Sequence, residues 1–127
     1  MSTRRSLLLL SIVVLLALAA CADSSTSTGS AAATISLGVS QFSGATSVTI
    51  RAGQAVKFDD SAGGAHHLVA GTDGKPSSEA GAPSELGSSG LSFSGGDVKI
   101  VTFPTAGTYQ ITCTIHPFMQ ATVTVTA

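Results

Sequence analysis

The sequence predicts an all-β domain, a sandwich or small barrel of about seven to eight short strands. Only 10% of the 127 residues are charged and 5% are aromatic, and a chain rich in Ser, Thr and Val is poorly suited to a helical bundle. Apolar residues also recur with a two-residue period in short runs, which is typical of strands, and glycine-containing turns separate these runs. The length fits a single domain.

Residues 1–20 have the layout of a secretory signal peptide. Arg4 and Arg5 precede the mostly apolar run Leu7–Ala20, and small residues follow at its end. The run is too short to span a bilayer comfortably as a permanent helix. We therefore expect cleavage before Cys21, with a short membrane anchor as the alternative interpretation.

The boundary Leu18-Ala19-Ala20-Cys21 resembles the lipobox of bacterial lipoproteins, in which the cysteine carries acyl chains. Each buried methylene contributes about 0.8 kcal/mol, so two or more chains would anchor the protein firmly. This resemblance implies an extracytoplasmic protein anchored to the cell membrane through lipid on Cys21. The alternative is an unmodified Cys21. Residues 21–33, which are mainly Ser, Thr, Ala and Gly, predict a flexible tether with an end-to-end distance of about 20 Å.

Residues 34–127 are predicted to form the globular domain, in which runs of alternating apolar residues mark the strands. The strands expected from this pattern are residues 34–39, 48–50, 56–58, 66–70, 97–103, 107–113 and 120–126. Residues 71–96 are rich in Gly, Ser, Pro and Ala and are long for a loop in a compact domain. Within them, residues 77–86 are a candidate for a short helix.

The charge balance of the exported chain is mildly acidic. From Cys21 onward, four Lys and Arg stand against seven Asp and Glu, which gives a net charge of −3. No basic patch and no interleaving of arginine with aromatic residues is visible, so nucleic acid is not an expected partner.

Three metal donors lie within seven residues near the C-terminus: the thiolate of Cys113, the imidazole of His116 and the thioether of Met119. One Cys, two His and a weak Met form the ligand set of a blue-copper electron-transfer site. The second histidine would come from the adjacent pair His66 and His67. Cys113 would otherwise be a free thiol in an exported protein, where such a thiol usually has a partner such as a metal. For Met119, packing in the core is the alternative.

Cys113–Met119, the preceding Phe103–Tyr109, and the earlier Phe58–Asp60 with His66 resemble the cupredoxins, the plastocyanin and amicyanin family. The two-residue gap on each side of His116 is most similar to the short ligand loop of the amicyanin-like members. The resemblance covers residues 35–127. It implies a cupredoxin-like Greek-key β-sandwich that binds one type 1 copper ion through His66, Cys113, His116 and Met119.

Strand alternation alone leaves both His66 and His67 open as the ligand. The resemblance favours His66, because amicyanin-like members have an aromatic residue, an Asn two positions later and the ligand six positions after that, where this chain has Phe58, Asp60 and His66. In the family, the residue that matches Asp60 offers its backbone N–H to the copper-bound sulfur, and its side-chain amide ties the ligand loops together. Asp60 lacks that amide, and His67 also stands where the family usually has Asn.

These observations favour a membrane-tethered, extracytoplasmic type 1 copper protein that carries one electron by cycling between Cu(II) and Cu(I). It would act as a monomer, with transient redox partner proteins that dock on a rim beside His116 formed by Pro117 and Phe118. Packing of Phe118 in the core is the alternative for that residue. Copper delivery or storage is the alternative function, because Cu(I) handling uses the same soft ligands. An enzyme is not expected, since four ligands leave no open position for a substrate.

Overall fold

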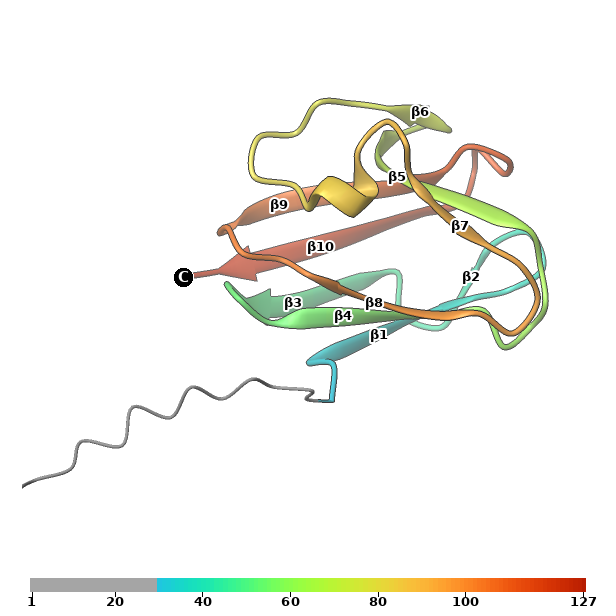
Figure 1. The fold of residues 1–127 in the computed structure, drawn as a ribbon, viewed down its shortest axis with the longest axis horizontal. Coiled ribbons are helices and arrows are strands. Elements are labelled where there is room, and N and C mark those ends of the chain that lie inside the picture. Colours follow the sequence, from blue (N-terminus) through green and yellow to red (C-terminus); the bar gives the residue numbers. More distant parts are fainter. Residues whose placement is uncertain (1–29) are drawn as a thin grey trace, which may run out of the picture.

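The computed structural model describes residues 30–127, so the predicted signal peptide, Cys21 and most of the predicted tether lie outside the described residues. Two β-sheets pack face to face, with the β9–β10 loop at one end of the sandwich and the C-terminus at the other (Figure 1). Between residues 30 and 127, no helix has the length and apolar character needed to cross a membrane.

The first sheet has the strand order β2-β1-β4-β8. β1 (Ala33–Leu37) runs parallel to β4 (Ala55–Asp59) and antiparallel to β2 (Phe42–Ser43). β8 (Val98–Thr102) pairs antiparallel with β4. The end of β4 thereby delivers the chain to the loop that precedes His66.

The second sheet has the strand order β3-β10-β9-β5-β6 and carries both ligand segments. β9 (Gly107–Cys113) lies between β10 (Gln120–Thr126) and β5 (His66–Thr72), antiparallel to both. β3 (Ser47–Arg51) runs parallel to β10, while β6 (Lys75–Pro76) and β7 (Leu91–Phe93) both pair with β5. The start of β5 and the end of β9 therefore meet at the same end of the sheet.

The predicted all-β sandwich is confirmed, with more strands than the sequence pattern indicates. Ten strands are present among the described residues, of which seven have five or more residues and three have only two or three. Two of the short ones, β6 and β7, lie in the segment that reads as a long loop. The candidate helix in residues 77–86 is a single 3-10 turn, η1 (Ser84–Leu86), which Leu86 anchors by complete burial.

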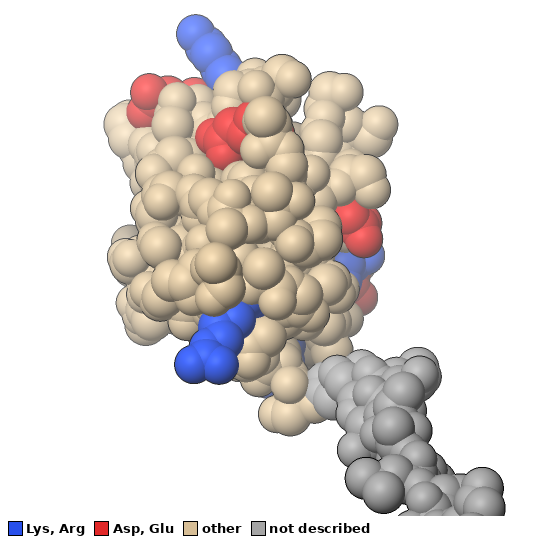
Figure 2. Space-filling model, turned by 90° about the vertical axis from the view of Figure 1, so that its left-hand side faces the viewer, with Lys and Arg blue, Asp and Glu red and all other residues tan. Residues whose placement is uncertain are grey.

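The core follows the two-residue alternation of the strands. In β9, Tyr109, Ile111 and Cys113 are all buried on one face, as the period predicts. At the sandwich end away from the β9–β10 loop, charged side chains are few and scattered (Figure 2). The buried residues are nearly all apolar, the polar ones being Asp60, His66 and Thr112, so apolar packing between the two sheets is the main source of stability.

Candidate metal centre

Three donor side chains come together at the end of the sandwich. The nearest ligand atoms of His66, Cys113 and His116 all lie within 4.8 Å of one another. Cys113 Sγ is 4.0 Å from Nδ1 of His66 and 3.8 Å from Nδ1 of His116. His66 and Cys113 are buried and His116 is half-buried, so the cluster reaches the surface on the His116 side only.

Strand register explains which of the paired histidines faces the thiol. Leu68 lies opposite Cys113 in the β5–β9 pair, and His66 shares the face of Leu68 because alternate residues of a strand point the same way. The His66 ring is 1% exposed. The His67 ring points to the other face, where its Nδ1 lies 3.0 Å from the Ser92 hydroxyl on β7. The structure thus brings His66 to Cys113 and leaves the His67 side chain outside the cluster.

Residues 113–119 form a tight turn closed by their own backbone. The Met119 N–H donates to the His116 carbonyl at 2.8 Å, and the Cys113 N–H donates to the Met119 carbonyl at 3.1 Å. The Thr112 hydroxyl donates to that same carbonyl at 3.3 Å. The Met119 side chain is 1% exposed and belongs to the same buried cluster as Cys113. Its position fits either ligation or core packing, so Met119 as a ligand stays a prediction.

The β5–β6 hairpin supports this turn from the side. Its two loop residues, Asp73 and Gly74, have φ angles of 52° and 72°, the positive pair expected of a type I′ turn. The Gly74 N–H donates to the Thr112 hydroxyl at 2.9 Å. A Cβ on Gly74 would approach the Pro117 ring to 3.0 Å. The hairpin therefore packs directly on the ligand turn and restrains it.

The N–H group that faces the thiol sulfur belongs to His67, and the expectation that Asp60 supplies it is wrong. The His67 N–H donates to Cys113 Sγ at 3.5 Å. The Asp60 N–H instead donates to the Asp97 carbonyl at 2.9 Å, because Asp60 directly follows β4 and lies beside the β7–β8 connection. The His67 carbonyl also accepts the Thr114 N–H at 2.9 Å. His67 therefore ties the two ligand segments together through its backbone, a role that the sequence reasoning missed.

The side chain of Asp60 also has a role that sequence reasoning missed, because it lies next to the His66 ring on the edge away from Cys113. Asp60 is fully buried, and its Oδ1 is 3.7 Å from His66 Nε2. Burial lowers the pKa of His66 below its usual value, although the Asp60 carboxyl acts in the opposite direction. A neutral imidazole is the form that binds a metal ion, so His66 is held in the state that ligation needs.

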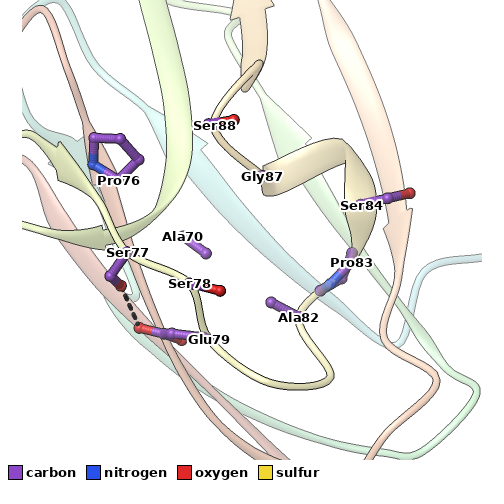
Figure 3. A pocket seen from close by; sticks show the side chains of 10 residues that line it. All are labelled: Ala70, Pro76, Ser77, Ser78, Glu79, Ala82, Pro83, Ser84, Gly87 and Ser88. Atoms are coloured by element: carbon purple, nitrogen blue, oxygen red, sulfur yellow. Dashed lines mark hydrogen bonds between the residues drawn. The ribbon is translucent and has the colours of Figure 1, made fainter.

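An open pocket of about 300 Å³ lies apart from these donors (Figure 3). It is lined by Ala70, Pro76, Ser77, Ser78, Glu79, Ala82, Pro83, Ser84, Gly87 and Ser88. The Glu79 carboxylate in its wall accepts the Ser77 hydroxyl and the Gln110 N–H, both at 3.3 Å. Glu79 thus fastens the 76–88 segment to β9, and the pocket shares no residue with the donor cluster.

The donor set fits copper. A metal–nitrogen and a metal–sulfur bond together span about 4.3 Å in a straight line, so separations of 3.8 and 4.0 Å allow one ion to contact both groups at a bent angle. Thiolate with imidazole suits copper. Cys113 is a free cysteine, so its sulfur is available to a metal.

Several solved structures share this fold. Amicyanin from Paracoccus versutus has a similar structure, with a TM-score of 0.55 and 23% sequence identity over 73% of this chain and 79% of that one. A Cu(I) form of an amicyanin variant gives a TM-score of 0.56 at 21% identity over 76% and 84% of the two chains. A reduced amicyanin variant gives 0.56 at 20% identity over 80% and 86%. A search of curated proteins found no match.

The solved structures establish the likeness of fold, and the family assignment comes from the sequence. Residues 31–126 match the copper-binding proteins of the plastocyanin/azurin family, a span that includes both sheets and all three clustered donors. Copper is therefore the metal that this site serves. Fold, donor set and sequence agree that the chain belongs to the plastocyanin/azurin family of copper-binding cupredoxins.

Proposed function

We propose that this protein is a one-electron carrier with a type 1 copper site formed by His66, Cys113, His116 and Met119. The observation that carries the proposal is the position of Cys113 Sγ, which lies 3.8 and 4.0 Å from the Nδ1 atoms of two histidines. When bound, copper supplies a Cu(II)/Cu(I) couple at these donors. The protein would be a carrier rather than an enzyme, since its donors enclose the site and leave His116 as the half-buried member.

The ligand segments are cross-linked in a way that favours rapid electron exchange. Thr114 bonds to His67 and Gly74 bonds to Thr112, while Cys113 bonds to Met119 across the turn, so the turn is held by two neighbouring segments and by its own backbone. A site whose geometry changes little between two oxidation states has a small reorganisation energy, which makes electron transfer fast. This rigidity supports electron transfer over copper delivery, because delivery requires the ligands to release the ion.

The surface around His116 supports transient docking of a redox partner protein. Phe118 is 97% exposed and Ile115 is 53% exposed, and Pro117 between them is also exposed. These side chains form an apolar rim on the only side where the donor cluster reaches solvent. A transient encounter needs an interface of less than about 1,200 Å², so a rim of this size is sufficient.

The test of the proposed function is the visible absorption spectrum of the Cu(II)-loaded protein, followed by its electron exchange rate. We expect an intense blue band from thiolate-to-copper charge transfer and reversible reduction without loss of the ion. Tight Cu(I) binding with no blue Cu(II) form would contradict the carrier function and favour copper delivery or storage.

Phe118→Glu tests the docking rim. Because Phe118 contacts solvent on nearly its whole surface, the substitution should leave the spectrum unchanged and slow bimolecular exchange by about tenfold, the equivalent of about 1.4 kcal/mol. Ile100→Glu is the matched control, since Ile100 is also an exposed apolar residue (57%) but lies within β8, in the sheet that carries none of the ligands. Equal slowing by both substitutions would show that added charge, rather than the rim, is responsible.

We further propose that the domain works outside the cytoplasm, tethered to the membrane by lipid on Cys21. The support is in the sequence: the signal-like residues 1–20, the lipobox-like Leu18–Cys21 and the Ser- and Thr-rich residues that follow. Detergent-phase partitioning of the full chain tests it, with Cys21→Ser as the comparison. Recovery of both proteins in the aqueous phase would reject the lipid anchor.

A further inference from the structure

Asp60 is a buried acidic residue whose surroundings are incompletely hydrogen-bonded. Its side chain is fully buried, and Oδ1 accepts the Gly64 N–H at 3.1 Å. Among the described residues, the buried side-chain nitrogen and oxygen atoms without a hydrogen-bond partner are Oδ2 of Asp60 and Nε2 of His66. Buried polar atoms are nearly always paired. The carboxyl oxygen nearest to Nε2 is Oδ1 at 3.7 Å, beyond hydrogen-bond distance, so the two side chains act on each other through charge in a buried setting.

The geometry directs the carboxyl group of Asp60 at the outer nitrogen of the His66 ring. Oδ1 lies 3.7 Å from Nε2, with both side chains inaccessible to solvent. The Gly64 N–H donates to the Asp60 carboxyl group. The Gly64 backbone packs so closely on the His66 ring that a Cβ at Gly64 would overlap Nε2. Only glycine fits there, and the ring edge is enclosed between Gly64, Asp60 and the backbone of Gly38, which also acts on the His66 ring.

The orientation of the ring fixes where its proton must be. Nδ1 of His66 faces Cys113 Sγ at 4.0 Å, so a metal bound between them takes the Nδ1 lone pair. The proton of the neutral imidazole then resides on Nε2, next to Asp60. A carboxylate that receives the second ring N–H of a ligand histidine fixes its tautomer and makes the ligand nitrogen more basic. A buried negative charge also interacts strongly with a nearby cation, since screening by water is weak.

We propose that Asp60 is a positioning residue whose carboxylate, 3.7 Å from Nε2 of His66, attracts the ring proton to Nε2, so that Nδ1 is presented to the metal, and lowers the reduction potential of the bound copper. The lowering of the potential follows because a nearby negative charge stabilises Cu(II) more than Cu(I). This inference rests on the proposed copper function and adds to it the group that tunes the potential. The part of the proposal that concerns the tautomer of His66 does not depend on copper and can be tested in the metal-free protein.

The test is Asp60→Asn, which removes the charge and keeps the shape. In the loaded protein we expect the equilibrium between reduced and oxidised forms to shift toward Cu(I) by about tenfold or more, the lower end of the effect of such partners, which corresponds to about 59 mV for one electron. Asp59→Asn is the matched control. It makes the same change in net charge one residue away, on a carboxylate that is ion-paired with Lys57 at 2.9 Å, and it should shift the potential far less.

A second readout uses the metal-free protein. Nitrogen chemical shifts of the His66 ring report its tautomer, and we expect the Nε2–H form in the original protein and a mixture in Asp60→Asn. Should Asp60→Asn fold poorly, Asp60→Ser removes the same charge with a smaller side chain and should shift the potential and the tautomer in the same direction.

A shift in potential no larger than that of Asp59→Asn, together with an unchanged tautomer, would overturn the role of Asp60. Failure of the proposed function would look different. The protein would then lack the blue Cu(II) spectrum with Asp60 in place, while the tautomer measurement would still decide whether Asp60 orients His66.

Discussion

The two ends of β9 have the same alternation of buried and exposed residues, but their buried side chains have different surroundings. At one end, Tyr109 is buried, its hydroxyl donates to the Thr105 carbonyl at 2.8 Å, and its ring packs 5.6 Å from that of Phe103. At the other end, Cys113 is equally buried, but its sulfur faces two histidine nitrogens at 3.8 and 4.0 Å. Tyr109 has a hydrogen-bond partner and a packing partner within the protein, whereas Cys113 faces two histidines that can share a metal ion with it.

The contrast shows how one strand serves both folding and function. Tyr109, Ile111 and Cys113 occupy the same face, so the strand itself supplies only burial and direction. What differs is the set of segments that meet each end: residues 103–107 around Tyr109, and the start of β5 with the 113–119 turn around Cys113. If this division holds, substitutions at the Cys113 end should change copper chemistry with little effect on folding, and substitutions at the Tyr109 end should do the reverse.

The largest effect should come from Cys113→Ser. The hydroxyl is close in size to the thiol and is hard where the thiolate is soft, so we expect complete loss of the blue absorption and much weaker copper binding. The metal-free protein should keep its strand content by circular dichroism. Cys21→Ser, the same substitution at the other cysteine of the chain, should leave the colour intact. A blue spectrum in the Cys113→Ser protein would remove the basis for the contrast.

A second large effect should separate the paired histidines. His66→Ala removes a ring next to Cys113 Sγ and should abolish the blue colour. His67→Ala removes the contact with Ser92 and keeps the backbone N–H that donates to the sulfur, so most of the colour should remain. Visible absorption of both loaded variants measures this, and their metal-free thermal unfolding serves as the control for folding. The reverse outcome would move the ligand to His67 and contradict the face assignment of β5.

The sequence predicts the ligands of the 113–119 turn more firmly than it predicts the histidine from β5. Cys113, His116 and Met119 are close in sequence, and Pro117 indicates a turn, so their grouping is predictable from local rules. The choice of His66 depended on a family resemblance, because alternation in residues 66–70 is consistent with either face. Register with β9 resolves it, since Leu68 lies opposite Cys113.

The contacts behind the ligands could not be predicted, because they depend on segments far apart in the chain. Asp60 bonds to Asp97, the first residue of the predicted strand 97–103, and His67 contacts Ser92, which lies in the region that sequence analysis leaves as a long loop. β6 and β7 are too short to show a two-residue apolar period, and they are strands only because they pair with β5. One local signal was available, since Asp73-Gly74 is a typical two-residue hairpin turn, and it predicts the return of the chain at β6.

The smallest effect should come from Tyr109→Phe, at the opposite end of β9 from Cys113. The substitution removes one hydrogen bond and keeps the ring packed against Phe103. The acceptor is the backbone carbonyl of Thr105, an exposed residue, so water can replace the lost donor and the cost should stay near the ordinary value of about 1 kcal/mol rather than that of a buried unpaired group. Urea unfolding of the metal-free protein measures the cost, and the visible spectrum and reduction potential should not change. A change in potential without a loss of stability would show that the two ends are coupled through β9, and the division between folding and function along this strand would then be wrong.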